Sequence, residues 1–177
     1  MPQWPRTVKH FRWFAVFSAL RDFFHPPREW LAEAGVKAGD AVLDFGCGRG
    51  GFTVAAARAV GRTGKVYALD AHPLAIESVR NKARRKKLDY VETIRSDGVT
   101  GLPTESVDVV LLYDVFHELD QPDAVLAELH RVIKPGGRLS FSDHHLEGEE
   151  VISRVTGAGL FEFAEKHENT FAFVKKV

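Results

Sequence analysis

Short apolar runs and longer amphipathic segments alternate along the chain. Five compact apolar runs predict strands buried in a parallel sheet, at residues 41–46, 64–70, 90–97, 107–114 and 138–143. Helical periodicity is expected at residues 51–61, 72–87 and 122–134, with Pro73 in the first turn of the second helix, a position that proline favours. This alternation predicts a doubly wound α/β fold with helices on both faces of the sheet.

The flanking segments add smaller elements. A short helix is expected from residue 28 until Gly35 ends it, and another at residues 149–156. Two final strands, at residues 159–166 and 170–176, are spaced as an antiparallel hairpin on the sheet edge. We therefore expect a mostly parallel seven-stranded sheet in one domain covering residues 28–177.

Residues 1–27 form an aromatic segment that we expect to be helical. Its apolar stretch from Phe11 to Phe24 is too short and too charged to cross a bilayer, because Arg12, Arg21 and Asp22 interrupt it. The segment is interpreted as a lid or packing element, and a homodimer interface is the alternative. The residues behind these interpretations are Trp13, Phe14, Phe17, Leu20, Phe23 and Phe24.

Composition excludes several classes of protein. The 24 basic residues balance the 24 acidic ones, so no net charge attracts nucleic acid, and we expect no specific nucleic-acid partner. The single cysteine, Cys47, excludes an internal disulfide and a cysteine-ligated cluster, which favours a cytoplasmic location. The basic run at residues 80–87 is interpreted as a solvated helix end that complements the helix dipole.

The stretch DFGCGRGGF, residues 44–52, fits two cofactor fingerprints. Gly46, Gly48 and Gly51 satisfy the G-x-G-x-x-G pattern of a dinucleotide-binding turn. Asp44, Gly46, Gly48 and Gly50 satisfy the D-x-G-x-G-x-G turn of enzymes that bind S-adenosylmethionine. Both need glycine where the chain turns sharply and a ligand approaches the backbone.

Acidic residues at strand ends favour the second fingerprint. Asp44 precedes the turn, where a carboxylate would repel a pyrophosphate but suits the ammonium of an amino acid. Asp97 can accept from the adenine amine, whereas Asp70 can accept from both ribose hydroxyls under either fingerprint and does not separate them. A short-chain dehydrogenase is disfavoured because the sequence holds no Tyr-x-x-x-Lys pair.

At this point the chain resembles the class I S-adenosylmethionine-dependent methyltransferases, in particular the ubiquinone/menaquinone-biosynthesis branch. The resemblance covers residues 28–177 and is carried by the segments VLDFGCGRG, VYALDAHP, IRSDG, VDVVLLYDVFHEL and LHRVIKPGGRLSFSD. It implies S-adenosylmethionine as the methyl donor. It also implies cofactor-binding roles for residues that hold the methionine end (Asp44, Gly46, Gly48), the ribose side (Asp70, Ala71), the adenine (Asp97, Gly98) and the sulfonium side (Tyr113).

The catalytic candidates are Asp114, which ends the fourth predicted strand, and His117, which follows shortly after it. His117 has the chemistry of a base at neutral pH, although a histidine bonded to nearby backbone is the simpler interpretation. Catechol-type methyltransferases, by resemblance, would hold magnesium at positions comparable to Asp114, Asp143 and His144. Histidine is a poor magnesium ligand and better suits a softer transition metal, and a plain Ser-Asp ending on the fifth strand also occurs in relatives without metal. The sequence therefore favours a site without metal.

The acceptor is expected to be a small molecule, with an apolar one suggested by the quinone branch. Two other function classes stay open: a module that binds the donor without catalysis, and, more distantly, a nicotinamide-dependent oxidoreductase. Calorimetry with S-adenosylhomocysteine and with a nicotinamide cofactor separates the oxidoreductase from the other two.

Overall fold

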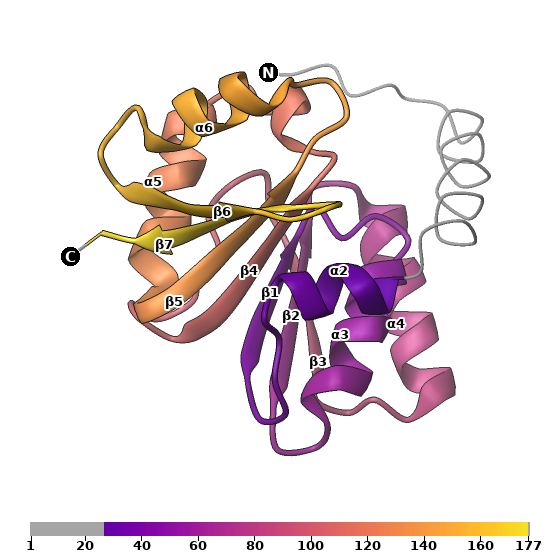
Figure 1. Ribbon diagram of the computed structural model, residues 1–177. Coiled ribbons are helices and arrows are strands. Elements are labelled where there is room, and N and C mark those ends of the chain that lie inside the picture. Colours follow the sequence, from indigo (N-terminus) through magenta and orange to yellow (C-terminus); the bar gives the residue numbers. More distant parts are fainter. Residues whose placement is uncertain (1–26, 177) are drawn as a thin grey trace.

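A computed structural model describes residues 27–176 as one seven-stranded sheet covered by helices (Figure 1). The strand order is β3-β2-β1-β4-β5-β7-β6, and β7 is antiparallel to both of its neighbours. The strands are β1 (Ala41–Phe45), β2 (Lys65–Asp70), β3 (Val91–Arg95), β4 (Val107–Tyr113), β5 (Ile133–Ser142), β6 (Phe161–Lys166) and β7 (Phe171–Lys175). The predicted fold class and the terminal hairpin are confirmed.

Helices cover both faces of the sheet. On one face lie α2 (Pro27–Glu33), α3 (Gly51–Val60) and α4 (Pro73–Lys86), and on the other lie α5 (Pro122–Val132) and α6 (Gly148–Thr156). A 3-10 turn, η1 (Phe116–Glu118), follows β4. Because β1 and β4 are central and covered twice, nearly all their residues are buried.

Two apolar layers hold the sheet between the helices. One packs Leu126 and Leu129 of α5 and Val151 of α6 against the sheet, with Phe141 and Phe173 at its centre. The other packs α2 and α3 over β1 and β4. Each fully buried large apolar side chain stabilises the fold by roughly 1.5–3 kcal/mol, so the strand ends are set on a rigid base.

The structure corrects the expected junction between α5 and β5. The sequence predicted a helix to residue 134 and a strand from residue 138, whereas α5 ends at Val132 and β5 begins at Ile133. Ile133 pairs with Val107, and the ladder resumes at Arg138 after a shift in register. Pro135-Gly136-Gly137 is therefore an irregularity within the strand, which the helix-ending signal of proline and glycine did not reveal.

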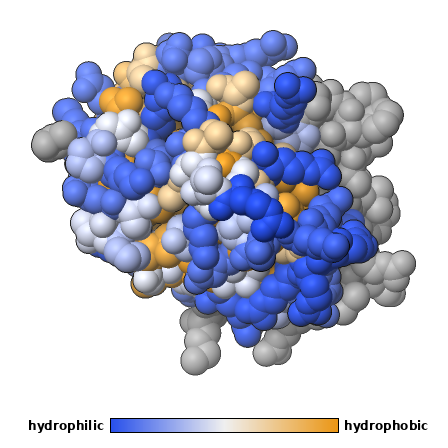
Figure 2. Space-filling view, turned by 90° about the horizontal axis from the view of Figure 1, so that it is seen from below, coloured by the Kyte–Doolittle hydropathy of each residue, from blue (hydrophilic) through white to orange (hydrophobic). Residues whose placement is uncertain are grey.

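The aromatic segment at residues 1–26 and its predicted helix lie outside the described residues. Within residues 27–176, no helix combines the length and the apolar character needed to cross a bilayer. Figure 2 shows the molecule from below the view of Figure 1, where hydrophilic side chains cover most of the face and apolar ones appear between them.

Candidate active site

The site-bearing edge of the sheet lies where β1 and β4 run side by side. From β1 the chain continues outward through β2 to β3, and from β4 it continues through β5, so the winding reverses between these two strands. Ligands of open α/β sheets bind beyond the carboxyl ends of the strands at such a switch point. Residues that end β1, β2, β3, β4 and β5 therefore form the candidate site.

The glycine turn after β1 adopts backbone angles that favour glycine. Gly46, Gly48 and Gly50 have φ values of 78°, 49° and 80°, all in the left-handed region. A Cβ atom on Gly46 would lie 2.8 Å from the Val115 side chain, because the chain after β4 packs directly on this turn. The main-chain N–H of Gly46 donates to the carbonyl of Leu69 over 2.9 Å, which ties the turn to β2.

Asp70, at the end of β2, is directed toward the glycine turn. Its Oδ2 accepts from the main-chain N–H of Gly48 over 2.9 Å, and its Oδ1 accepts from the N–H of His72 over 2.7 Å. Burial raises the pKa of the Asp70 carboxyl above its ordinary value, although these two hydrogen bonds oppose the shift. Each oxygen keeps a lone pair after one such bond, so the carboxylate can accept from a pair of hydroxyls.

Asp44 lies in β1, two residues before the first glycine of the turn. Its side chain is buried, and Thr53 of α3 donates its hydroxyl to Oδ2 over 2.5 Å. Burial raises the pKa of the Cys47 thiol, and the charges of Asp44 and Asp70 raise it further. The cysteine is therefore an inert small residue in the turn.

Asp97 and Gly98 begin the loop that follows β3. Asp97 is exposed, and Ser96 beside it donates its main-chain N–H to the carbonyl of Asp70 over 3.2 Å, which brings the loop to the edge that carries Asp70. Ala71 is half-buried immediately after Asp70. These residues thus lie together with Asp70 along the β2–β3 end of the sheet.

An ion pair that sequence reasoning missed anchors this loop to α5. Thr100 donates its main-chain N–H and its hydroxyl to Glu128, over 2.9 and 2.5 Å. Arg131 donates to both oxygens of Glu128, over 2.7 and 2.8 Å, and to the carbonyl of Leu102. The Arg131 guanidinium lowers the pKa of Glu128 to about 2. The sequence indicated this ion pair only through the three-residue spacing of Glu128 and Arg131 on a predicted helix, which makes the two side chains neighbours.

The side chain of Tyr113 was expected to line the sulfonium side of the donor, but it points into the core. Its ring packs edge-on against Trp30 and Phe52 in the layer under α2 and α3. Its hydroxyl bonds to Ser140 over 2.8 Å, and burial raises its pKa. The side chain is therefore core, and only its main chain at the end of β4 borders the site.

Beyond β4 and β5, two aspartates and two histidines form reciprocal pairs. Asp143 accepts from the main-chain N–H of His117 over 3.1 Å and bonds to its Nδ1 over 2.9 Å. Asp114 accepts in the same way from His144, over 3.2 Å from the N–H and 2.8 Å to Nδ1. Each aspartate thus follows one strand and holds the histidine that follows the other.

These pairs differ in exposure. The Asp143 side chain is fully buried and that of His117 is 22% exposed, whereas the His144 side chain is 66% exposed. Asp114 has a φ of 52°, a left-handed angle that costs a non-glycine residue free energy and persists only where the surroundings impose it. The partnership of His117 with Asp143 was not predicted, since it depends on the pairing of Tyr113 with Ser142.

Comparison with known proteins identifies the family. Residues 43–141, more than half of the chain, match the sequence model of the family described as "Methyltransferase domain". The chain belongs to this family. In the methyltransferase domain, the matched residues run from β1 to the end of β5 and include the glycine turn, Asp70, Asp97 and His117.

Curated relatives and solved structures agree with this assignment. The methyltransferase domain is 32% identical to a demethylmenaquinone methyltransferase of Lactobacillus johnsonii over 63% of this chain and 47% of that protein. It is 34% identical to an aklanonic acid methyltransferase of a Streptomyces species over 80% of this chain and 61% of that protein. A solved SAM-dependent methyltransferase from Aquifex aeolicus superposes with a TM-score of 0.77 at 27% identity, covering 84% of this chain and 89% of that one.

The chain spans about half to two thirds of the length of these curated relatives. The same fold also occurs in the [4+2]-cyclase SpnF, with a TM-score of 0.68 at 19% identity, over 78% of this chain and 58% of that one. That likeness concerns the fold alone. The same fold can carry different reactions, so the residues of the site determine the chemistry.

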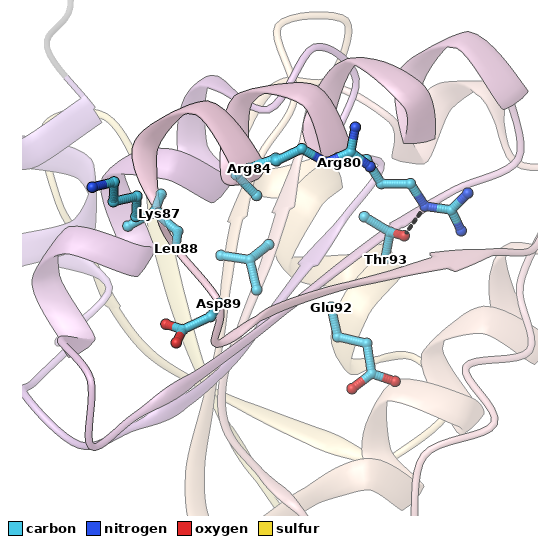
Figure 3. Close-up of a pocket in the computed structure, with 9 residues that line it drawn as sticks. Arg80, Arg84, Lys87, Leu88, Asp89, Glu92 and Thr93 are labelled. Atoms are coloured by element: carbon cyan, nitrogen blue, oxygen red, sulfur yellow. Dashed lines mark hydrogen bonds between the residues drawn. The ribbon is translucent and has the colours of Figure 1, made fainter.

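The basic end of α4 forms a groove away from this site. The groove, of about 590 Å³, is lined by the last two turns of α4 and the start of β3, at the opposite ends of the strands from Asp44 and Asp70. Figure 3 shows Arg80, Arg84 and Lys87 with Asp89 and Glu92, and Arg80 donates to Thr93 over 2.8 Å. Charges of both signs in an open groove fit the predicted solvated helix end.

Proposed function

We propose that this chain transfers a methyl group from S-adenosylmethionine to a small acceptor with an apolar body. The family assignment and the carboxylates on both sides of the glycine turn support the donor. Two relatives, demethylmenaquinone methyltransferase and aklanonic acid methyltransferase, carry a small molecule in their names, and the first of these names is that of a quinone, which supports the acceptor class.

The residues at the turn fit the donor better than a dinucleotide. Asp44 places a buried carboxylate at the glycine turn, which repels a pyrophosphate but suits an ammonium, and Asp70 can accept from the ribose hydroxyls of either cofactor. This arrangement is the observation that carries the proposal. Bound S-adenosylmethionine supplies a methyl group already activated on a sulfonium.

Each donor group is assigned to residues at one stretch of the sheet edge. Asp44, with Gly46 and Gly48, would hold the methionine end, and Asp70 with Ala71 would hold the ribose. Asp97 and Gly98 would hold the adenine. The main chain at Tyr113, where β4 ends, would border the sulfonium side.

His117 is proposed as the base for an acceptor that must lose a proton. Asp143 fixes the Nδ1 side of the ring, which leaves Nε2 as the atom that can take a proton. The main-chain bond from His117 to the same carboxylate holds the histidine in place at both ends. Asp114 would act beside it by positioning His144.

The His117→Gln variant tests this assignment. With a labelled methyl donor and a panel of hydroquinones and hydroxylated naphthoquinones, we expect kcat to fall by about 10²–10⁴-fold, the usual contribution of a general base. S-adenosylhomocysteine affinity should stay within about twofold. His130→Gln, in α5, is the matched control, since His130 bonds the Lys176 carbonyl and contacts the Phe161 ring.

Two other outcomes of this assay decide the alternatives. Unchanged turnover in His117→Gln would remove the histidine from the chemistry. Binding of S-adenosylhomocysteine with no turnover on any acceptor would favour the donor-binding module.

The role of residues 1–27 remains a proposal that rests on sequence. We propose that this aromatic segment serves as a lid or packing element on the acceptor side, and that a homodimer through it is the alternative. Its support is the density of large aromatic residues, which need an apolar surface to cover. The single cysteine, buried in the glycine turn, supports the proposed cytoplasmic location.

A further inference from the structure

β3 forms one edge of the sheet, and one of its two sides is free. It pairs with β2, and no other strand within residues 27–176 pairs with it. The Tyr90 carbonyl and the Ser96 N–H bond to β2 at the two ends of β3. Because main-chain groups alternate between the two sides of a strand, Thr93 and Arg95 direct their N–H and C=O groups away from β2. An edge of this kind can pair with another extended chain.

The groove at the basic end of α4 borders this free edge. It has a volume of about 590 Å³ and lies between the last two turns of α4 and the start of β3 (Figure 3). Arg80 of α4 donates to the Thr93 hydroxyl over 2.8 Å, so the side chain of Thr93 faces α4. An extended chain about as long as the five residues of β3 could lie beside it, with every second side chain directed toward α4.

The negative side chains of the groove already have partners. Asp89 pairs with Arg62 over 3.4 Å, and Glu92 pairs with Lys65 over 3.1 Å. Arg62 and Lys65 do not line the groove, so they neutralise its two acids from outside. The charge that the groove presents to a ligand is therefore that of its basic residues.

The basic side chains come from α4, and two of them lack a carboxylate partner. Arg84 and Lys87 are exposed, and neither forms an ion pair with any residue that the structure describes. Arg80 bonds to Thr93 through Nε, and its terminal nitrogens carry further N–H donors. Three cations thus border the free edge of the strand.

We propose that the free edge of β3 binds an extended acidic segment of a partner protein as an added strand. The main chain of the segment would pair with Thr93 and Arg95. Its acidic side chains, at every second position, would meet Arg84 and Lys87. Charge complementarity decides the composition of the segment, and the free strand edge decides its extended conformation.

Other occupants fit these features less well. Residues 1–26 of this chain include more basic than acidic residues, so the basic groove would repel them. Two copies joined through β3 would bring two basic grooves together, and a contact between β3 and the opposite edge strand, β6, would not close into a symmetric dimer. A nucleic acid would satisfy the cations but has no peptide main chain to pair with the strand edge.

Binding of a model peptide to the full chain tests the charge requirement. The probe is a fluorescent, end-blocked heptapeptide that alternates glutamate and valine, and fluorescence anisotropy measures its binding. We expect saturable binding that is at least about tenfold weaker for the double variant Arg84→Gln/Lys87→Gln, because two ionic contacts are lost. Arg58→Gln, exposed on α3, is the matched control and should bind as the parent protein does. No binding of this peptide, or equal binding by the double variant, would overturn the proposal.

Two N-methylated versions of the peptide test the addition of a strand. One is methylated at its glutamates and the other at its valines, so both keep all their charges. In an added strand only one of these two sets directs its N–H groups at β3, so one version should lose binding and the other should keep it. Equal effects of the two methylations would show that charge alone holds the peptide, and would contradict strand addition.

Hydrogen exchange of the parent protein gives a measurement that needs no variant. The unmodified peptide should slow amide exchange at Thr93 and Arg95, whose N–H groups face the free edge. Unchanged exchange at both residues would contradict the proposal even if the double variant failed to fold. Tighter binding of a single-stranded oligothymidylate than of the peptide would assign the cations to nucleic acid and overturn it as well.

Discussion

At the scale of single residues, strand ends were predictable and the partners across strands were not. Asp44 and Asp70 follow from the rule that parallel strands end at one edge, and the structure places both beside the glycine turn. The bond of Asp44 to Thr53 and that of His117 to Asp143 depend on packing and register, which a single sequence does not encode locally. Tyr113 was assigned by resemblance, and its side chain lies in the core instead.

Asp44 has both a structural and a proposed binding role, which two variants separate. Thr53→Val removes only the hydroxyl that donates to Asp44, so it should lower stability by roughly 1–2 kcal/mol and change S-adenosylhomocysteine affinity little. Asp44→Asn removes the charge, so it should weaken S-adenosylhomocysteine by about tenfold or more beyond any loss of stability. Calorimetry and thermal unfolding check the two effects. Losses of equal size in both variants would mark Asp44 as a purely structural partner of the turn.

At the scale of elements, helix and strand types were predictable and their junctions less so. Seven strands and the covering helices follow from hydrophobic period and from glycine and proline positions. The start of β5 at Ile133 could not be predicted, because the pairing of Ile133 with Val107 overrides the local signals. The turn η1 could not be predicted either, because it depends on the packing of Phe116 in the core. The loop after β3 had no local signal for its anchor, the Glu128–Arg131 pair of α5.

Glu128 makes the stability of this loop dependent on pH. Its folded pKa, about 2, lies below its ordinary value of 4.5, so the ionised form is favoured by folding. The contribution is complete above about pH 4.5 and is lost as the pH falls from there toward 2. Glu128→Gln should therefore lower the free energy of unfolding by roughly 1–2 kcal/mol at pH 7, with a deficit that shrinks below pH 4.5.

Urea unfolding at a series of pH values measures this effect. Glu162→Gln, on the exposed side of β6, is the matched control and should follow the parent protein. If Glu128→Gln lowers the free energy of unfolding by the same amount from pH 7 to pH 3, the charge of the Glu128 carboxylate does not anchor the loop.

At the scale of the whole molecule, the residues assigned to the donor all come after the aromatic segment in the sequence. The described residues, 27–176, build the sheet and its two apolar layers. Deleting residues 1–24 should therefore leave a folded domain with S-adenosylhomocysteine affinity within about threefold. Acceptor turnover should collapse if the segment is the proposed lid.

Circular dichroism, calorimetry and the methyl-transfer assay distinguish the roles of this segment. An unfolded or insoluble truncated chain would make residues 1–24 part of the core. A truncated chain that keeps full turnover but loses a dimer in analytical ultracentrifugation would make them an interface instead.

Calorimetric titration of the full chain with S-adenosylhomocysteine and, separately, with NAD⁺ tests directly which cofactor the glycine turn binds. We predict one S-adenosylhomocysteine site with a Kd in the low micromolar range, roughly −7 to −8 kcal/mol, and no measurable NAD⁺ binding. Asp70→Ala should weaken S-adenosylhomocysteine by roughly 1.5–3 kcal/mol, because a charged acceptor of two hydroxyl bonds is lost. Binding of NAD⁺ in place of S-adenosylhomocysteine would contradict the proposed methyl donor. Unchanged S-adenosylhomocysteine affinity in Asp70→Ala would contradict the proposed position of its site.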